Sequence, residues 1–216
     1  MRKEQAGILA LLLVIAIAVG SIWLRRSNSR SIDLDPYAAM GIVAGEETSA
    51  LLGNQGDVVV VVEDPGEDDD PVLKTQLARL KSGLSTAGKV RIKAVEKVVM
   101  DPMTRLATGG TLPPARFASL RGKYPDAAAM VLLMPFPMLG DSDLAALKAG
   151  RQRYVVASAA VPGYRKLVAS GAVSLAIVPR PKDGSEPSSA KPKTTRERFD
   201  RDYVIAKPET ADRLPY

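Results

Sequence analysis

Five consecutive valines at positions 58–62 limit the possible folds of this chain more than any other feature. An unbroken apolar run of this length, without alternating polar residues, indicates a strand that is buried on both faces. Such strands are typical of parallel sheets that carry helices on both sides. We therefore expect an α/β protein in which residues 58–62 form a fully buried strand.

Strand and helix patterns alternate along the segment that contains the valines. Their order and spacing indicate right-handed βαβ units and a parallel sheet. The predicted fold class is α/β, a three-layer Rossmann-like or flavodoxin-like sandwich with a five-stranded parallel sheet in the order 2-1-3-4-5. Residues 101–112 form a long loop in this prediction. The predicted strands are residues 58–62, 90–99, 127–134, 153–158 and 173–178, and the predicted helices are residues 36–52, 72–87, 113–124, 141–149 and 162–170.

The first of these helices has a clear start and an unusual interior. Asp35 can cap its N-terminus, and Pro36 fits the first turn. Gly41 and Gly45 lower the helix propensity of the segment. We interpret these two glycines as a helix face that packs closely against a neighbour.

A membrane-spanning helix is predicted at residues 6–24, which are predominantly apolar and carry no charge. Their length is close to the ~20 residues that cross the hydrocarbon core of a bilayer. A cleavable signal peptide is the alternative, with a small-residue site at 18–20. The apolar run continues through Trp23 and Leu24, which favours an uncleaved anchor. The bilayer is thus an expected partner through residues 6–24.

The expected location is the inner (cytoplasmic) membrane, with a single pass and the soluble domain on the extracytoplasmic side. A short basic head followed by an apolar run is the signal that export machinery recognises. The C-terminal tail contains Phe199 and Tyr203 among charges, and it either docks as a short strand or frays. The predicted organisation is a basic head (1–5), a transmembrane helix (6–24), a linker (25–35), an α/β domain (36–178), a disordered linker rich in Pro, Ser and Lys (179–195) and a tail (196–216).

Composition removes several classes of function. The chain contains no cysteine and no histidine, which excludes thiolate nucleophiles and His-dependent triads and removes the commonest general base. The formal net charge is +6, but aromatic residues make up only 5% of the chain, so the interleaved pattern of a nucleic-acid binder is missing. The first strand lacks a following GxGxxG loop, and its acidic loop would repel a phosphate. We expect no cofactor.

Candidate ligand-binding residues follow from the rule that open α/β sheets bind ligands at the carboxyl ends of their strands. The loop at 63–70 after the first strand is rich in carboxylates, and Asp64 is the candidate there. Pro135 and Phe136 after the third strand form an apolar rim suited to a flat ligand or a protein. Ser158 after the fourth strand directs a hydroxyl toward the same crevice. Glu63 and Asp64 are weak candidates for holding a hard cation.

Two families share parts of this pattern. Response-regulator receiver domains have acids after strand one and a hydroxyl after strand four, but Met134 and Pro135 stand here where the phosphoacceptor aspartate belongs. The segments GDVVVVVED, DAAAMVLLMPFP, RYVVASAAVPGY and LVASGAVSLAIVPRP resemble one lobe of a type 1 periplasmic sugar-binding protein over most of residues 36–180. This resemblance implies an α/β lobe whose ligand is clamped against a second lobe.

The predicted function is a single-pass, membrane-anchored, non-enzymatic domain that binds a small ligand or an envelope protein at the strand ends. The tail from Thr194 to the C-terminus is a possible docking arm. The first alternative is a metal-dependent enzyme that uses the carboxylates of the 63–70 loop. The second alternative is a scaffold subunit of a membrane complex.

Overall fold

The computed structural model describes residues 32–66, 70–86, 88–158, 163–180 and 192–213. The chain separates into two compact units, Met1–Asp33 and Leu34–Tyr216, and almost all described residues belong to the second. The predicted transmembrane helix at 6–24 lies outside the described residues. Within the ranges given above, no helix has the length and apolar character that a membrane crossing requires.

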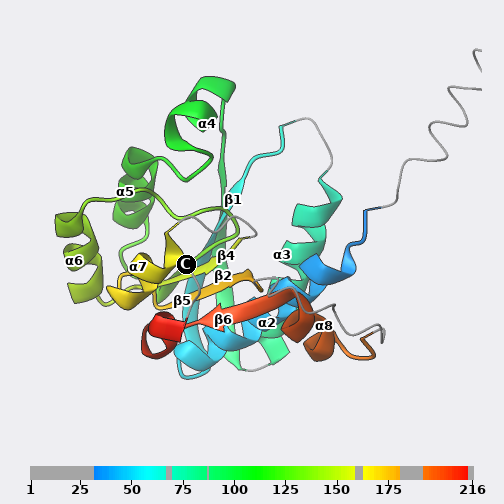
Figure 1. The fold of residues 1–216 in the computed structure, drawn as a ribbon. Coiled ribbons are helices and arrows are strands. Elements are labelled where there is room, and N and C mark those ends of the chain that lie inside the picture. Colours follow the sequence, from blue (N-terminus) through cyan, green and yellow to red (C-terminus); the bar gives the residue numbers. More distant parts are fainter. Residues whose placement is uncertain (1–31, 67–69, 87, 159–162, 181–191, 214–216) are drawn as a thin grey trace, which may run out of the picture. The chain divides into compact units, whose positions relative to one another are not determined.

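A single six-stranded sheet forms the centre of the second unit (Figure 1). The strand order is β2-β1-β3-β4-β5-β6, which confirms the order predicted for the first five strands. These five are parallel, and β6 pairs antiparallel with β5. The prediction of five strands was therefore one strand short. The strands are β1 (Gln55–Glu63), β2 (Lys89–Val98), β3 (Ala129–Leu132), β4 (Arg153–Ala157), β5 (Leu175–Pro179) and β6 (Tyr203–Ala206).

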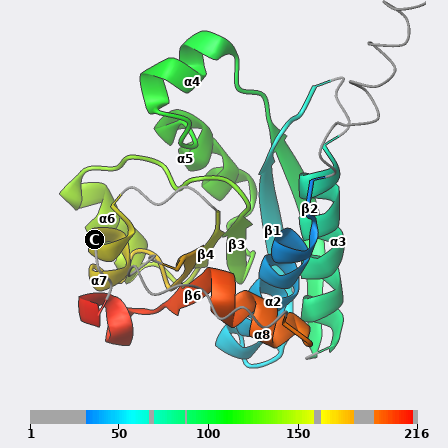
Figure 2. The same cartoon turned by 45° about the vertical axis from the view of Figure 1, so that its right-hand side comes forward.

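The helices cover both faces of the sheet, as the buried valines require (Figure 2). Val58, Val60 and Val62 pack with residues of α2, α3 and α8, whereas Val59 and Val61 pack with residues of α5, α6 and α7. All five valines are at most 1% exposed. The helices are α2 (Asp35–Leu51), α3 (Pro71–Thr86), α4 (Pro102–Thr108), α5 (Pro114–Lys123), α6 (Asp141–Ala149), α7 (Tyr164–Ala169), α8 (Thr195–Asp202) and the 3₁₀ helix η1 (Pro208–Arg213).

Glycine residues allow the backbones of helices α2 and α3 to come into close contact. A Cβ atom built on Gly41 would lie 2.4 Å from the carbonyl oxygen of Gln76, and one on Gly45 would lie 2.4 Å from that of Leu80. A Cβ on Gly83 of the opposite helix would lie 2.2 Å from the carbonyl oxygen of Ile42. The two backbones therefore approach closely, in agreement with the interpretation of Gly41 and Gly45 as a closely packed face.

Residues 102–108, expected to belong to a loop, form helix α4. The Asp101 side chain accepts hydrogen bonds from the backbone N–H groups of Met103 and Thr104, both at 3.0 Å. Gly109 ends the helix in the left-handed conformation, with φ of 60°. The prediction failed because this helix is only seven residues long and buries no side chain, so it lacks the buried apolar stripe that marks the longer helices.

The described C-terminal segment, residues 192–213, packs against the rest of the second unit. Helix α8 places Phe199 against α2, and β6 pairs Tyr203 with Pro179 and Ala206 with Ala176. Asp35 does not cap its own helix, because the N-cap position is Leu34 and no side chain caps it. The Asp35 carboxylate instead lies 3.1 Å from the guanidinium of Arg198 on α8.

Candidate functional site

A cleft of about 380 Å³ lies at the carboxyl ends of the central strands. The ends of β1, β3 and β4 form its base, and the first turns of α2 and α3 form one wall. This is the position at which open α/β sheets bind ligands, next to the point where the strand order reverses. The lining residues are Tyr37, Met40, Glu63, Asp64, Pro65, Asp70, Val72, Leu73, Gln76, Arg105, Leu133, Met134, Pro135, Ala157 and Ser158.

The acidic side of the cleft is already partly neutralised. Glu63 forms an ion pair with Arg105 of α4, and Asp64 lies 3.5 Å from the ammonium group of Lys97. The Asp70 carboxylate accepts hydrogen bonds from the first N–H groups of α3, which makes it a helix cap. In the described parts of the chain, which exclude residues 67–69, no group of three or more potential metal ligands gathers. Glu63 and Asp64 therefore each already pair with a cationic side chain of the same chain.

A buried amide closes the base of the cleft. Gln76 of α3 donates its amide N–H to the carbonyl oxygen of Ala157 at the end of β4, at 3.0 Å. The same nitrogen lies 3.0 Å from the sulfur of Met40 on α2. One side chain therefore ties two helices to the sheet at the site. The sequence gives no indication of this role for Gln76, because a single glutamine in an amphipathic helix carries no distinguishing signal.

The structure brings three of the four predicted ligand-binding residues to the cleft. Asp64, Pro135 and Ser158 all line it, and Ser158 is 8% exposed. Phe136 does not line it. Its ring is 3% exposed and packs edge-on against Phe117, with ring centroids 5.3 Å apart.

Two buried tyrosines lie near the cleft, and both remain protonated at neutral pH. Burial raises the pKa of Tyr164 to about 12, with smaller opposing effects from the Phe136 backbone and the Ser158 side chain. Burial also raises the pKa of Tyr203 to about 12, and nearby Tyr37 adds to the shift. Neither phenol can therefore act as a base near pH 7, since its ionised form is strongly disfavoured.

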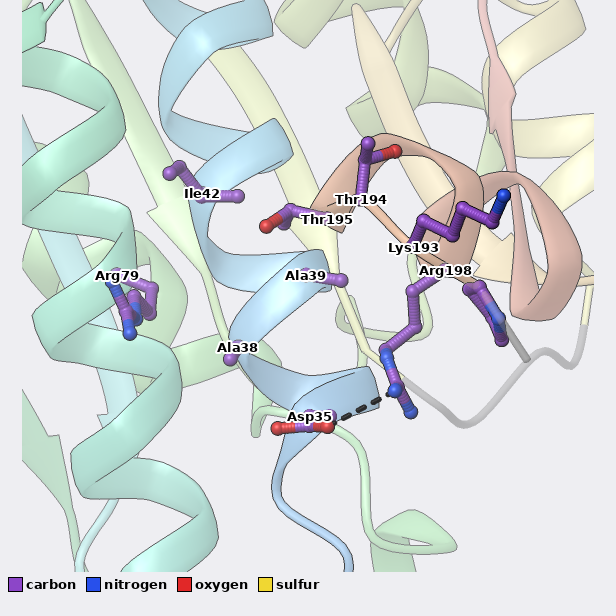
Figure 3. A pocket seen from close by; sticks show the side chains of 10 residues that line it. Asp35, Ala38, Ala39, Ile42, Arg79, Lys193, Thr194, Thr195 and Arg198 are labelled. Atoms are coloured by element: carbon purple, nitrogen blue, oxygen red, sulfur yellow. Dashed lines mark ion pairs between the residues drawn. The ribbon is translucent and has the colours of Figure 1, made fainter.

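A second hollow, of about 250 Å³, lies between α2, α3 and α8 (Figure 3). Ala38, Ala39 and Ile42 of α2 line it, and the side chain of Arg198 reaches across to Asp35. Arg79 of α3 also lines the hollow. Because only helical side chains and the segment before α8 line this hollow, we regard the strand-end cleft as the candidate site.

Known proteins match this chain in structure but not in sequence. No protein family matches the sequence, and neither does any curated protein. An arabinose binding protein from Geobacillus stearothermophilus has a TM-score of 0.56 and 12% identity, covering 83% of this chain and 63% of that chain. A sugar-binding protein of a sugar ABC transporter from Bacillus halodurans has a TM-score of 0.55 and 18% identity, covering 82% and 64%.

A third match is a periplasmic solute binding protein of an ABC transporter from Actinobacillus succinogenes with bound D-allose. Its TM-score is 0.54 at 12% identity, and the match covers 83% of this chain and 62% of that chain. This chain thus spans less than two thirds of the length of each of the three proteins. The resemblance to one lobe of a type 1 periplasmic sugar-binding protein is therefore confirmed at the level of the fold.

Proposed function

We propose that this protein is a non-enzymatic binding protein that holds a small, polar, uncharged or cationic ligand in the strand-end cleft. The observation that carries the proposal is the position of the cleft, where β1, β3 and β4 end and where this class of sheet binds ligands. The cleft combines hydrogen-bonding groups with an apolar wall, which is the usual composition of a small-molecule site.

The charges at the cleft support this choice of ligand class. Glu63, Asp64 and Asp70 place three carboxylates on the lining, against the two cations of Arg105 and Lys97 that pair with Glu63 and Asp64, so the carboxylate of Asp70 is in excess. An anionic ligand would meet net repulsion there. A sugar would instead use the polar groups as hydrogen-bond donors and acceptors, and the matched sugar-binding proteins make sugars the first ligands to test.

We further propose that residues 6–24 anchor the protein in the inner membrane, with the binding domain outside the cytoplasm. The support comes from the sequence, where an uncharged span of bilayer length is flanked by basic residues. Limited proteolysis in intact and permeabilised cells tests this proposal. We expect the protease to cut within residues 181–191 without permeabilisation of the inner membrane. Protection of these residues until the inner membrane is permeabilised would refute the proposed orientation.

The binding proposal is tested by calorimetric titration of the full-length protein in mild detergent with a panel of monosaccharides that includes D-arabinose and D-allose. We expect at least one sugar to bind, and Asp64→Asn to weaken it on the order of tenfold, as expected when a hydrogen bond to a charged group is lost. Asp141→Asn is the matched control. Asp141 also forms an exposed ion pair, with Lys166 at 3.0 Å, but it lies outside the cleft.

The outcomes separate clearly. A sugar whose affinity falls in Asp64→Asn but not in Asp141→Asn supports binding in the cleft. Equal sugar affinity in both variants and the parent protein would show that the sugar binds outside the cleft. Absence of binding by every sugar and by a set of small cationic ligands would refute the proposed ligand class.

A further inference from the structure

Among the residues that the structure describes, Tyr164 carries a buried hydroxyl without a hydrogen-bond partner. Tyr164 is the first residue of helix α7, and its side chain is 3% exposed. Buried polar groups of native proteins are hydrogen-bonded in the large majority of cases, so an exception needs an explanation. The Tyr164 phenol is therefore a candidate functional group.

The phenol lies next to a residue of the strand-end cleft. Burial raises the pKa of Tyr164 to about 12, while the Phe136 backbone and the Ser158 side chain act against that rise, so both groups are close to the phenol. Ser158 lines the cleft, whereas Tyr164 does not. The Ser158 hydroxyl is thus within reach of both the phenol and a molecule in the cleft.

The protonation state of Tyr164 determines the direction of a hydrogen bond between the two hydroxyls. The phenol keeps its proton at neutral pH, because burial disfavours its ionised form. A serine hydroxyl has one hydrogen and two lone pairs. If the phenol donates to the Ser158 oxygen, the serine keeps its own hydrogen for an acceptor in the cleft. Hydrogen bonds in such a chain polarise and strengthen one another.

We propose that Tyr164 is a positioning residue of the strand-end cleft, which donates to Ser158 when Ser158 donates to an oxygen of the ligand. A ligand oxygen that accepts the Ser158 hydrogen leaves the serine's lone pairs for the phenol. This role rests on the proposed function and narrows its ligand class to neutral molecules that present a hydroxyl or carbonyl oxygen at Ser158. An ammonium group offers only donors and does not fit this position.

Stability without added sugar separates this role from a structural one. Tyr164→Phe removes an unpaired hydroxyl, so the variant should be at least as stable in urea at neutral pH as the parent protein. Tyr154→Phe is the matched control and should be less stable. Tyr154 is 2% exposed, but its hydroxyl donates to Gln152 at 3.0 Å, and it does not line the cleft. If both variants lose equal stability, the Tyr164 phenol has a partner within the protein, which would overturn the proposal.

Calorimetric titration with the monosaccharide panel, beginning with D-arabinose and D-allose, measures the coupling between the two hydroxyls. For the sugar that binds most tightly, Tyr164→Phe should weaken the affinity about fivefold, the effect of one hydrogen bond between neutral groups. Tyr154→Phe should change it by less than about twofold. In the Ser158→Ala background, Tyr164→Phe should have no further effect, because the two residues act through one contact.

The outcomes distinguish this role from the proposed function itself. Sugar binding that Tyr164→Phe leaves unchanged, or weakens equally with and without the Ser158 hydroxyl, would overturn the role of Tyr164 and leave the binding function intact. Binding of small cations but of no sugar would overturn it as well. If neither sugars nor small cations bind the parent protein, the proposed function fails, and the role of Tyr164 fails with it.

Discussion

The contact between α2 and α3 allows a stability prediction with a defined magnitude. A Cβ atom at Gly83 would lie 2.2 Å from the carbonyl oxygen of Ile42, whereas ordinary contacts begin at 3.4 Å. This oxygen belongs to the backbone of a helix, so it cannot rotate away as a flexible side chain could. In Gly83→Ala the two helices must therefore move apart by about 1 Å.

Two opposing effects determine the size of the change. Overpacking costs about 1–3 kcal/mol, and the upper end applies here because the obstacle is backbone. Alanine in a helix offsets part of this cost, by roughly 0.5–1 kcal/mol relative to glycine. The expected net loss is about 2 kcal/mol of unfolding free energy. For a domain of this size that loss lowers the melting temperature by about 4–8 °C.

The assay is urea and thermal unfolding of the full-length protein in mild detergent, followed by circular dichroism. Gly122→Ala is the matched control. Gly122 lies in helix α5, and a Cβ atom there would meet nothing within 4 Å, so this variant should gain roughly 0.5–1 kcal/mol. If Gly83→Ala is as stable as the parent protein or more stable, the argument from close backbone packing is wrong.

Further predictions concern pH, the C-terminal segment and metals. Burial raises the pKa of Tyr164 to about 12 in the folded protein, whereas the pKa of the phenol in the unfolded chain is about 10. The free energy of unfolding therefore has its full value below about pH 10 and falls by up to about 3 kcal/mol as the pH rises towards 12. Tyr164→Phe should flatten that part of the stability–pH curve, and an unchanged curve would contradict the assignment. Phe199→Ala should cost about 3–5 kcal/mol in urea unfolding, because its ring is 1% exposed against α2; a loss below about 1 kcal/mol would show that α8 is not part of the folded unit. Millimolar Mg²⁺ or Ca²⁺ should leave the melting temperature unchanged. A rise of several degrees would instead support the alternative of a metal-dependent enzyme with a cation at Glu63 and Asp64.

Much of the fold was predictable because it follows from local pattern. The valines at 58–62 require cover on both faces, and α6 begins and ends where the sequence predicted, at Asp141 and Ala149. The helix at 102–108 escaped prediction for a physical reason. Asp101, Pro102 and Gly109 are start and stop signals for a helix, but the residues between them bury no face.

The candidate site was only partly predictable. The rule about strand ends selected Asp64, Pro135 and Ser158, and the structure places these three residues along one cleft, while their role in ligand binding stays a prediction. Phe136 follows Pro135 directly, yet its ring packs into the core with Phe117 and Tyr154. The direction of a side chain in an irregular loop depends on the surrounding packing, which no periodicity in the sequence reports.

The sequence by itself determined the buried parallel sheet, the alternation of strands and helices, and the absence of cysteine and histidine chemistry. These properties depend on residue type and short-range spacing. Only the tertiary structure decided that β6 extends the sheet, that Gln76 joins α3 to the end of β4, and that the side chains of Met103 and Leu106 on α4 stay exposed. Each of these depends on contacts between residues far apart in the chain, whose formation is governed by the packing of the whole domain.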